Sequence, residues 1–309
     1  MSDRQDGGSG AHDASRRALD RVRGSRSRTA AAHLPRSRQL RLGVVVVGGL
    51  GVLALLGPEL TPYDPATQVL GRRLEPPSAS HPLGTDALGR DVATRIVYGA
   101  RVSLALSVAV VAVRLVVGTA IGVVAGYAGG VVDSSLMRVV DIQLAFPGLV
   151  LALVVAGLLG PSLANVLIAL SIVGWATYAR VVRGSVLSIK ERPFVRSARL
   201  YGAPPRRIVR RHVLPGVAGP VVVLATMNLG TVVLTAAGLS FLGLGAQPPT
   251  AEWGTMIADG RRHLRAAPWL TAAPGVAIML TVIGFNLLGD GLRDSLDADA
   301  LEDTERRFV

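Results

Sequence analysis

Half of the 309 residues are hydrophobic and only 17% are charged, and the mean hydropathy of +0.45 excludes an ordinary soluble domain. The chain has no cysteine, which excludes disulfides, thiolate metal sites and thiol catalysis. The net charge is +12, but no aromatic-rich basic motif accompanies it, so nucleic acid is not an expected partner.

The apolar residues gather in six runs, each close to the length that crosses a bilayer as a helix. The sequence therefore predicts an all-α polytopic membrane protein, localised to the cell membrane, with six transmembrane helices. The expected spans are about 42–58, 102–127, 142–159, 165–187, 213–244 and 269–288.

The segments between these runs differ in charge. Residues 1–41 hold ten Arg against four Asp, which predicts a disordered cytoplasmic tail that can also contact lipid. Residues 59–101 are balanced in charge and rich in proline, as in an external loop, and residues 128–141 are expected to form a short loop. Residues 297–309 form an acidic tail. Basic residues collect in cytoplasmic loops, so the Arg-rich tail and a second basic segment at 180–212 place both termini in the cytoplasm.

The second expected span carries two features of its own. Gly118, Gly122 and Gly126 recur every four residues on one helix face, a spacing that lets another membrane helix approach closely. Arg114 lies near the middle of the span, where a charge is costly. We expect Arg114 either to line a translocation path or to face a water-filled cavity without a specific role, and the sequence leaves both open.

The most basic internal segment, residues 190–215, lies between the fourth and fifth spans. Phe194, Ala198 and Tyr201 fall on one side of a helix and arginines on the other, which predicts a short amphipathic helix on the inner membrane face. Gly202 permits a sharp exit, and Pro204-Pro205 ends one helix and starts the next. Such an elbow, tied to two spans, can transmit a push from a partner; the alternative is an ordinary basic loop.

Enzymatic and metal chemistry are not expected. The only lysine, Lys190, is not preceded by glycine, so no phosphate-binding loop is present. The five histidines are far apart and none lies within a span, which argues against a metal site, a cofactor or an intramembrane protease. A secondary transporter driven by an ion gradient remains the alternative function, although the expected spans contain no Asp or Glu.

The segment FVRSARLYGAPPRRIVRRHVLP resembles the cytoplasmic coupling loop of ABC importer permeases. Arg196-Ser197-Ala198 occupies the place of that family's Glu-Ala-Ala triplet, followed at the family spacing by Gly202, His212 and Leu214-Pro215. HPLGTDALGRDVATRIVYGARVSL, GYAGGVVDSSLMRVVDIQLAFP, LSFLGLGAQPPTAEWGTMI and FNLLGDGLRDSLD are similar, in order, to the C-type subunits of the dipeptide, oligopeptide and nickel permeases.

This resemblance implies a pore formed with a sister permease, two cytoplasmic ATP-binding subunits and an extracytoplasmic substrate-binding protein. ATP hydrolysis would take place in the separate subunits, and the solute would be a dipeptide, a longer peptide, a nickel chelate or another small solute. The residues expected to form the docking surface for the ATPase are Phe194, Arg196, Ser197, Ala198, Tyr201, Gly202, Ala203, Arg206, Arg207, His212 and Pro215.

Overall fold

A computed structural model describes residues 38–307 of the chain. The helices in chain order are α2 (Arg38–Leu60), α3 (Val92–Ala128), α4 (Gly130–Ala145), α5 (Gly148–Leu159), α6 (Leu163–Lys190), α7 (Pro193–Leu200), α8 (Pro205–Ile208), α9 (Leu214–Phe241), α10 (Trp253–Gly260) and α11 (Trp269–Arg307). Shorter turns are η1 (Leu70–Arg72), the π-helical η2 (Val209–Val213) and η3 (Arg261–His263). Apart from one bridge between Thr85 and Asp91, the regular structure of residues 38–307 is helical.

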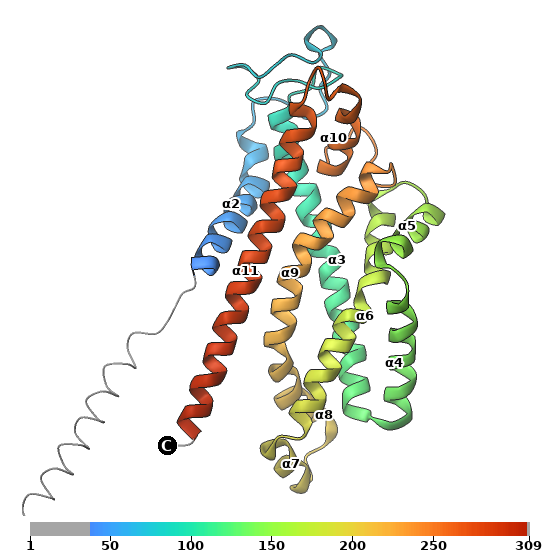
Figure 1. Ribbon diagram of the computed structural model, residues 1–309, viewed down its shortest axis with the longest axis vertical. Coiled ribbons are helices and arrows are strands. Elements are labelled where there is room, and N and C mark those ends of the chain that lie inside the picture. Colours follow the sequence, from blue (N-terminus) through green and yellow to red (C-terminus); the bar gives the residue numbers. More distant parts are fainter. Residues whose placement is uncertain (1–37, 308–309) are drawn as a thin grey trace, which may run out of the picture. The chain divides into compact units, whose positions relative to one another are not determined.

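The long helices run beside one another, with α3 packed on α6 and α11 on both α2 and α9 (Figure 1). The short helices α7 and α8 lie at one end of these helices, which we call the elbow end. Helix α10 and residues 61–91 lie at the other end, which we call the loop end (Figure 1). Different segments of the chain therefore form the surfaces of the two ends.

Five of the described helical stretches are long and apolar enough to cross a membrane. Helices α4 and α5 make a sixth if they are counted as one span, because together they pass the same test but bend by 87° at Phe146-Pro147. The prediction of an all-α polytopic membrane protein is confirmed. The break follows from Pro147, which lacks an N–H and disfavours a helical conformation at Phe146.

The predicted loop is wrong, and several helices extend beyond the predicted spans. Residues 128–141 do not form a loop: α4 begins at Gly130, after a turn in which Gly129 and Gly130 both have positive φ. Helix α3 begins at Val92, ten residues before the predicted span, because the Asp91 carboxylate caps it by accepting a 2.7 Å hydrogen bond from the Thr94 N–H. The predicted acidic tail is helical as far as Arg307, as a continuation of α11. The predicted N-terminal tail lies outside the described residues, except for residues 38–41, which open α2.

The core consists of apolar clusters that follow one another along the helices. Trp253 is fully buried in the cluster at the loop end, where its indole N–H donates to the Ile96 carbonyl. Leu170 of α6 belongs to a second cluster, formed with residues of α3, α5 and α9. Val195 and Ile208 belong to a third cluster, which ties the short elbow helices to α6 and α9. The elbow is therefore packed against the long helices.

Candidate functional site

The segment between α6 and α9 folds as the expected elbow of two short helices. Pro193 occupies the first turn of α7, where its missing N–H costs nothing, and Pro205 does the same in α8. From Pro205 the chain continues without interruption through η2 into α9, so α8 is a direct extension of a long membrane-spanning helix. The elbow is thus joined directly to α6 at one end and to α9 at the other.

Helix α7 ends in a Schellman turn centred on Gly202. Gly202 has φ +77°, its N–H donates to the Arg199 carbonyl at 2.9 Å, and the Ala203 N–H donates to the Ala198 carbonyl at 3.0 Å. Both alanines also touch the third apolar cluster, which is the hydrophobic contact that accompanies this motif. The role of Gly202 is conformational, because no neighbouring atom lies close to the space that a Cβ would occupy.

The buried side of α7 differs from the predicted one. Val195 and Ala198 face the cluster of α6 and α9, whereas Phe194 is exposed and Tyr201 is 91% exposed. The prediction that Phe194, Ala198 and Tyr201 share the apolar face is therefore wrong. Val195 is the fully buried residue of α7, and it packs in the third apolar cluster. Tyr201 follows the last turn of α7 as its C-cap residue.

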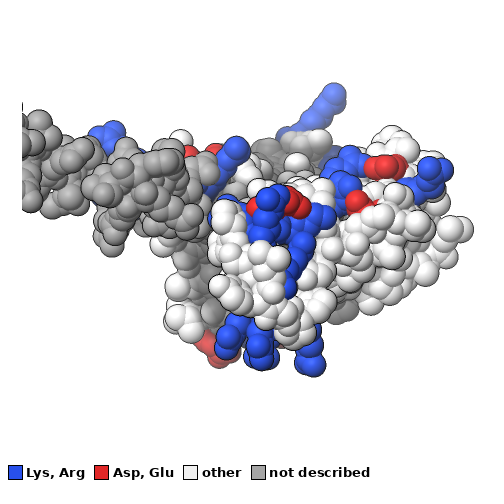
Figure 2. Space-filling view, turned by 90° about the horizontal axis from the view of Figure 1, so that it is seen from below, with Lys and Arg blue, Asp and Glu red and all other residues white. Residues whose placement is uncertain are grey.

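The exposed surface of the elbow combines two apolar side chains with many arginines. Leu200 and Tyr201 are 88% and 91% exposed at the tip of the turn. Seven exposed arginines surround them: Arg192, Arg196, Arg199, Arg206, Arg207, Arg210 and Arg211. Figure 2, which views the molecule from the elbow end, shows how strongly Lys and Arg outnumber Asp and Glu on this face.

A few polar contacts hold the elbow in place. Arg199 lies over the Tyr127 ring at the end of α3, and Phe194 and His212 pack ring to ring with centroids 5.5 Å apart. The Lys190 ammonium donates to the Gly126 carbonyl at 3.0 Å. Arg196 takes the position of the family glutamate and donates to the Glu191 carboxylate at 2.6 Å; this hydrogen bond lowers the pKa of Glu191.

The remaining predicted residues lie elsewhere, in the packing of α3 against α6. Gly118, Gly122 and Gly126 all face α6; a Cβ on Gly122 would come within 2.6 Å of the Ala179 carbonyl oxygen. Arg114 is on the same side of α3, buried over Gly174. Its guanidinium donates twice to the Leu170 carbonyl, from Nε at 2.9 Å and Nη2 at 2.6 Å. This placement favours a packing role for Arg114, and its role in a translocation path stays a prediction.

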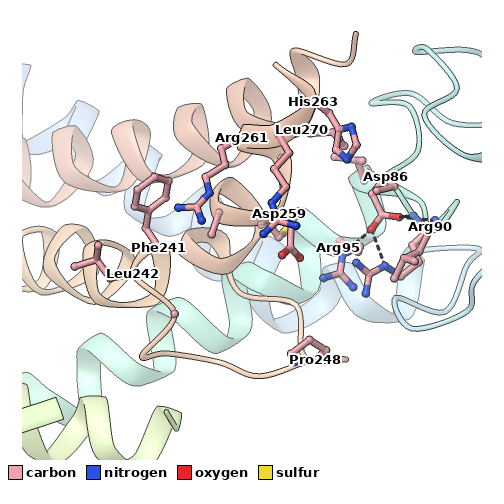
Figure 3. A pocket seen from close by; sticks show the side chains of 18 residues that line it. Asp86, Arg90, Arg95, Phe241, Leu242, Pro248, Asp259, Arg261, His263 and Leu270 are labelled. Carbon is pink, nitrogen blue, oxygen red and sulfur yellow. Dashed lines mark hydrogen bonds and ion pairs between the residues drawn. The ribbon is translucent and has the colours of Figure 1, made fainter. Parts of the chain in front are cut away.

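Sequence reasoning missed a pocket of about 530 Å³ at the loop end. Asp86, Arg90 and Arg95 lie on one side of it and Phe241 and Arg261 on the other (Figure 3). Asp86 pairs with Arg90 at 2.6 Å and with Arg95 at 3.6 Å, and Arg261 lies over the Phe241 ring. The sequence offered one signal for this pocket, the alternation of acidic and basic residues in TDALGRDVATR. The balanced charge of the loop was instead interpreted only as typical of an external segment.

Residues 118–301, more than half of the chain, match the family model described as binding-protein-dependent transport system inner membrane component. The chain belongs to this family. It is a multi-pass permease subunit of an ABC importer, which sets aside the alternative of an ion-gradient transporter. Members of such importers work with ATP-binding and substrate-binding partners.

Curated relatives match the permease over most of its length. The dipeptide transport system permease protein DppC of Alkalihalophilus pseudofirmus is 44% identical, over 87% of this chain and 89% of its own. The glutathione transport system permease protein GsiD of Pectobacterium atrosepticum is 46% identical, over 84% and 88%. A probable D,D-dipeptide transport system permease protein, DdpC of Escherichia coli, is 41% identical, over 83% and 86%.

Proposed function

We propose that the permease carries dipeptides or similar short peptides and that its elbow is the docking surface of an ATPase subunit. The solute class is supported by the names of the similar permeases, which are dipeptide and glutathione transporters. A sister permease completes the pore, and one ATPase docks on the elbow of each. ATP is hydrolysed in those separate subunits.

One observation supports the docking surface most strongly. Leu200 and Tyr201 project almost fully exposed from a turn whose backbone is held by the Schellman hydrogen bonds. Large apolar side chains in such a position are typical of a protein contact, because their burial in a partner is favourable and costs little ordering of the backbone. The surrounding arginines suit a partner groove lined with carboxylates.

The elbow also suits the transmission of force. Alternating access needs a packed element with two stable arrangements and a source of energy that favours one of them. The elbow is continuous with α9 and packed on α6, so an ATPase that pulls on it shifts both helices. On this proposal the elbow end and both termini are cytoplasmic, and the loop end faces the substrate-binding protein.

The test is a double substitution, Leu200→Ser with Tyr201→Ser, in the complete importer. We expect the variant permease to insert normally, to lose most of the co-purified ATPase, and to lose ATP-dependent uptake of a labelled dipeptide into vesicles. Leu60→Ser, which changes another strongly exposed leucine, at the far end of α2, is the control. Full retention of the ATPase by the double variant would contradict the docking role of the elbow. If unlabelled dipeptides do not compete with the ATP-dependent uptake, the proposed solute class is wrong.

A further inference from the structure

A polar stripe runs along one side of α4. Ser134, Arg138 and Asp141 are spaced at i, i+4 and i+7, which places them on the same helix face, and all three are exposed. Helix α4 is the first half of the bent pair that forms the sixth candidate span, and Val140 is its one buried residue. A polar face on a membrane helix therefore lies open on the surface of this chain.

Helix α6 extends the same surface. Its exposed side carries Thr177, Arg180, Gly184 and Ser188, again at the spacing of one helix face. An ion pair between Arg180 and Asp141 joins the two helices, and its side chains remain 53% and 65% exposed. The pair is thus not enclosed by the α4–α6 packing but presented at its edge.

The ion pair lies well inside the span rather than at its end. Arg180 is ten residues from the elbow end of α6 and Asp141 is eleven from the start of α4, about 15 Å along each helix. Lipid cannot hydrogen-bond such groups, and charged residues at membrane depth face protein or a water-filled cavity. Arginine can extend toward the membrane surface along its long side chain, but the short side chain of Asp141 cannot.

Another part of the exposed surface of α4 is apolar. Val132 and Val139, seven residues apart, are exposed well away from the stripe around the helix and make an apolar strip suited to lipid or to another helix. Helix α4 thus presents a polar stripe and an apolar strip to different surroundings, as expected of a helix that borders both an apolar medium and an aqueous one.

We propose that the stripe of α4 and α6 is a wall of the water-filled translocation pathway, and that the Arg180–Asp141 pair is where charged groups of the solute make contact. The inference goes beyond the family function, which does not assign these residues. An ion pair open to water contributes little stability, so its members can exchange partners at low cost. A peptide offers the complementary groups: its carboxylate suits the fork of the guanidinium, and its ammonium suits Asp141.

The absence of cysteine in this chain makes a direct test simple, because each introduced cysteine is its only thiol. Ser134→Cys and Thr177→Cys place thiols on the stripe, and Val132→Cys and Val139→Cys place matched thiols on the apolar strip of α4. The complete importer in vesicles is treated with a charged, membrane-impermeant methanethiosulfonate, with and without nucleotide, and the added mass on this chain is followed in time.

We expect both stripe positions to react at least about tenfold faster than both apolar positions in at least one nucleotide state, because the reactive thiolate forms only in water. Stripe thiols that react no faster than the apolar ones in every state would overturn the proposal and indicate that the sister permease or lipid covers this surface. Since the measurement needs no known solute and records thiol reactivity rather than ATPase retention or uptake, its failure is separate from failure of the proposed function.

The role of the charge itself is tested on the Thr177→Cys background. Arg180→Gln should lower the ratio of the reaction rate with an anionic reagent to that with a cationic one by several-fold, because it removes a positive charge from the wall beside the thiol. Arg262→Gln, at an exposed arginine of the loop end, is the control and should leave the ratio unchanged. Equal ratios in the two variants would remove Arg180 from the pathway.

Discussion

The two ends of the bundle satisfy their polar groups in opposite ways. At the loop end, ionisable residues are buried and paired within the chain: His81 with Asp91 at 2.9 Å, and Asp86 with Arg90 at 2.6 Å. Glu252 is buried as well and caps α10 by accepting from the N–H groups of Gly254 and Thr255. At the elbow end, seven arginines are exposed, Leu200 and Tyr201 are almost fully exposed, and the ion pair between Arg196 and Glu191 is open to solvent.

This difference separates self-contained structure from surface that needs a partner. Burying a charged group is costly unless the group is paired. Loss of one partner at the loop end therefore leaves the other buried without its pair and destabilises the fold. The elbow end holds its shape through the Schellman turn, the burial of Val195 and a few polar contacts, and it leaves Leu200 and Tyr201 exposed. Substitutions at the loop end should therefore reduce stability, whereas substitutions at the elbow should reduce transport in a protein that still folds.

The largest effect is expected for Asp91→Ala at the loop end. The change removes the cap of α3 and leaves His81 without its buried partner, at a cost of about 3 kcal/mol. The melting temperature in detergent should fall by several degrees and the yield of folded protein should drop. Glu59→Ala, at an exposed acid of the same end, is the control and should melt like the wild type. A wild-type melting temperature for Asp91→Ala would contradict the view that the loop end depends on its buried pairs.

A smaller effect on folding, but a complete one on transport, is expected for Gly202→Val. A β-branched residue at φ +77° is strained by about 1–2 kcal/mol, which displaces Tyr201 and the end of α7. The variant should reach the membrane in normal amounts and lose ATP-dependent uptake. Gly48→Val, at an α2 position with open space around it, tests whether an added side chain alone is harmful. Uptake at the wild-type rate by Gly202→Val would show that the turn is not mechanically important.

The smallest effect is expected for Arg196→Ala. The Arg196 hydrogen bond lowers the pKa of Glu191, so the pair can stabilise the fold only while Glu191 is ionised, and that contribution disappears as the pH falls through the lowered pKa. Both groups are exposed, and such pairs contribute little. Thermal melts of wild type and variant should therefore coincide at neutral pH and at acidic pH. A clear difference at neutral pH that vanishes in acid would mean that the elbow, too, is held together by its charges.

Much of the architecture was predictable because long apolar runs leave little choice in a membrane. The elbow was predictable too, since Gly202 and Pro204-Pro205 constrain the backbone locally whatever surrounds them. Helix α4 was missed because its polar residues suggested a loop. Two of its acids, Asp133 and Asp141, pair with Arg183 and Arg180 of the neighbouring α6, and the sequence does not reveal these partners. The buried pairs of the loop end were missed for a related reason, since balanced charges in sequence do not reveal which partners meet.

The sequence by itself determined the all-α membrane architecture, the turn of the elbow and the family, because these depend on hydrophobic length, backbone conformation and ordered motifs. Only the tertiary structure decided which sides of those helices are buried and which are exposed. It turned Val195 rather than Phe194 inward, set Arg114 against the Leu170 carbonyl, and left the Arg180–Asp141 pair open. A side chain's environment is set by the elements packed against it, and residues 39 positions apart, such as Asp141 and Arg180, become neighbours only when their helices meet.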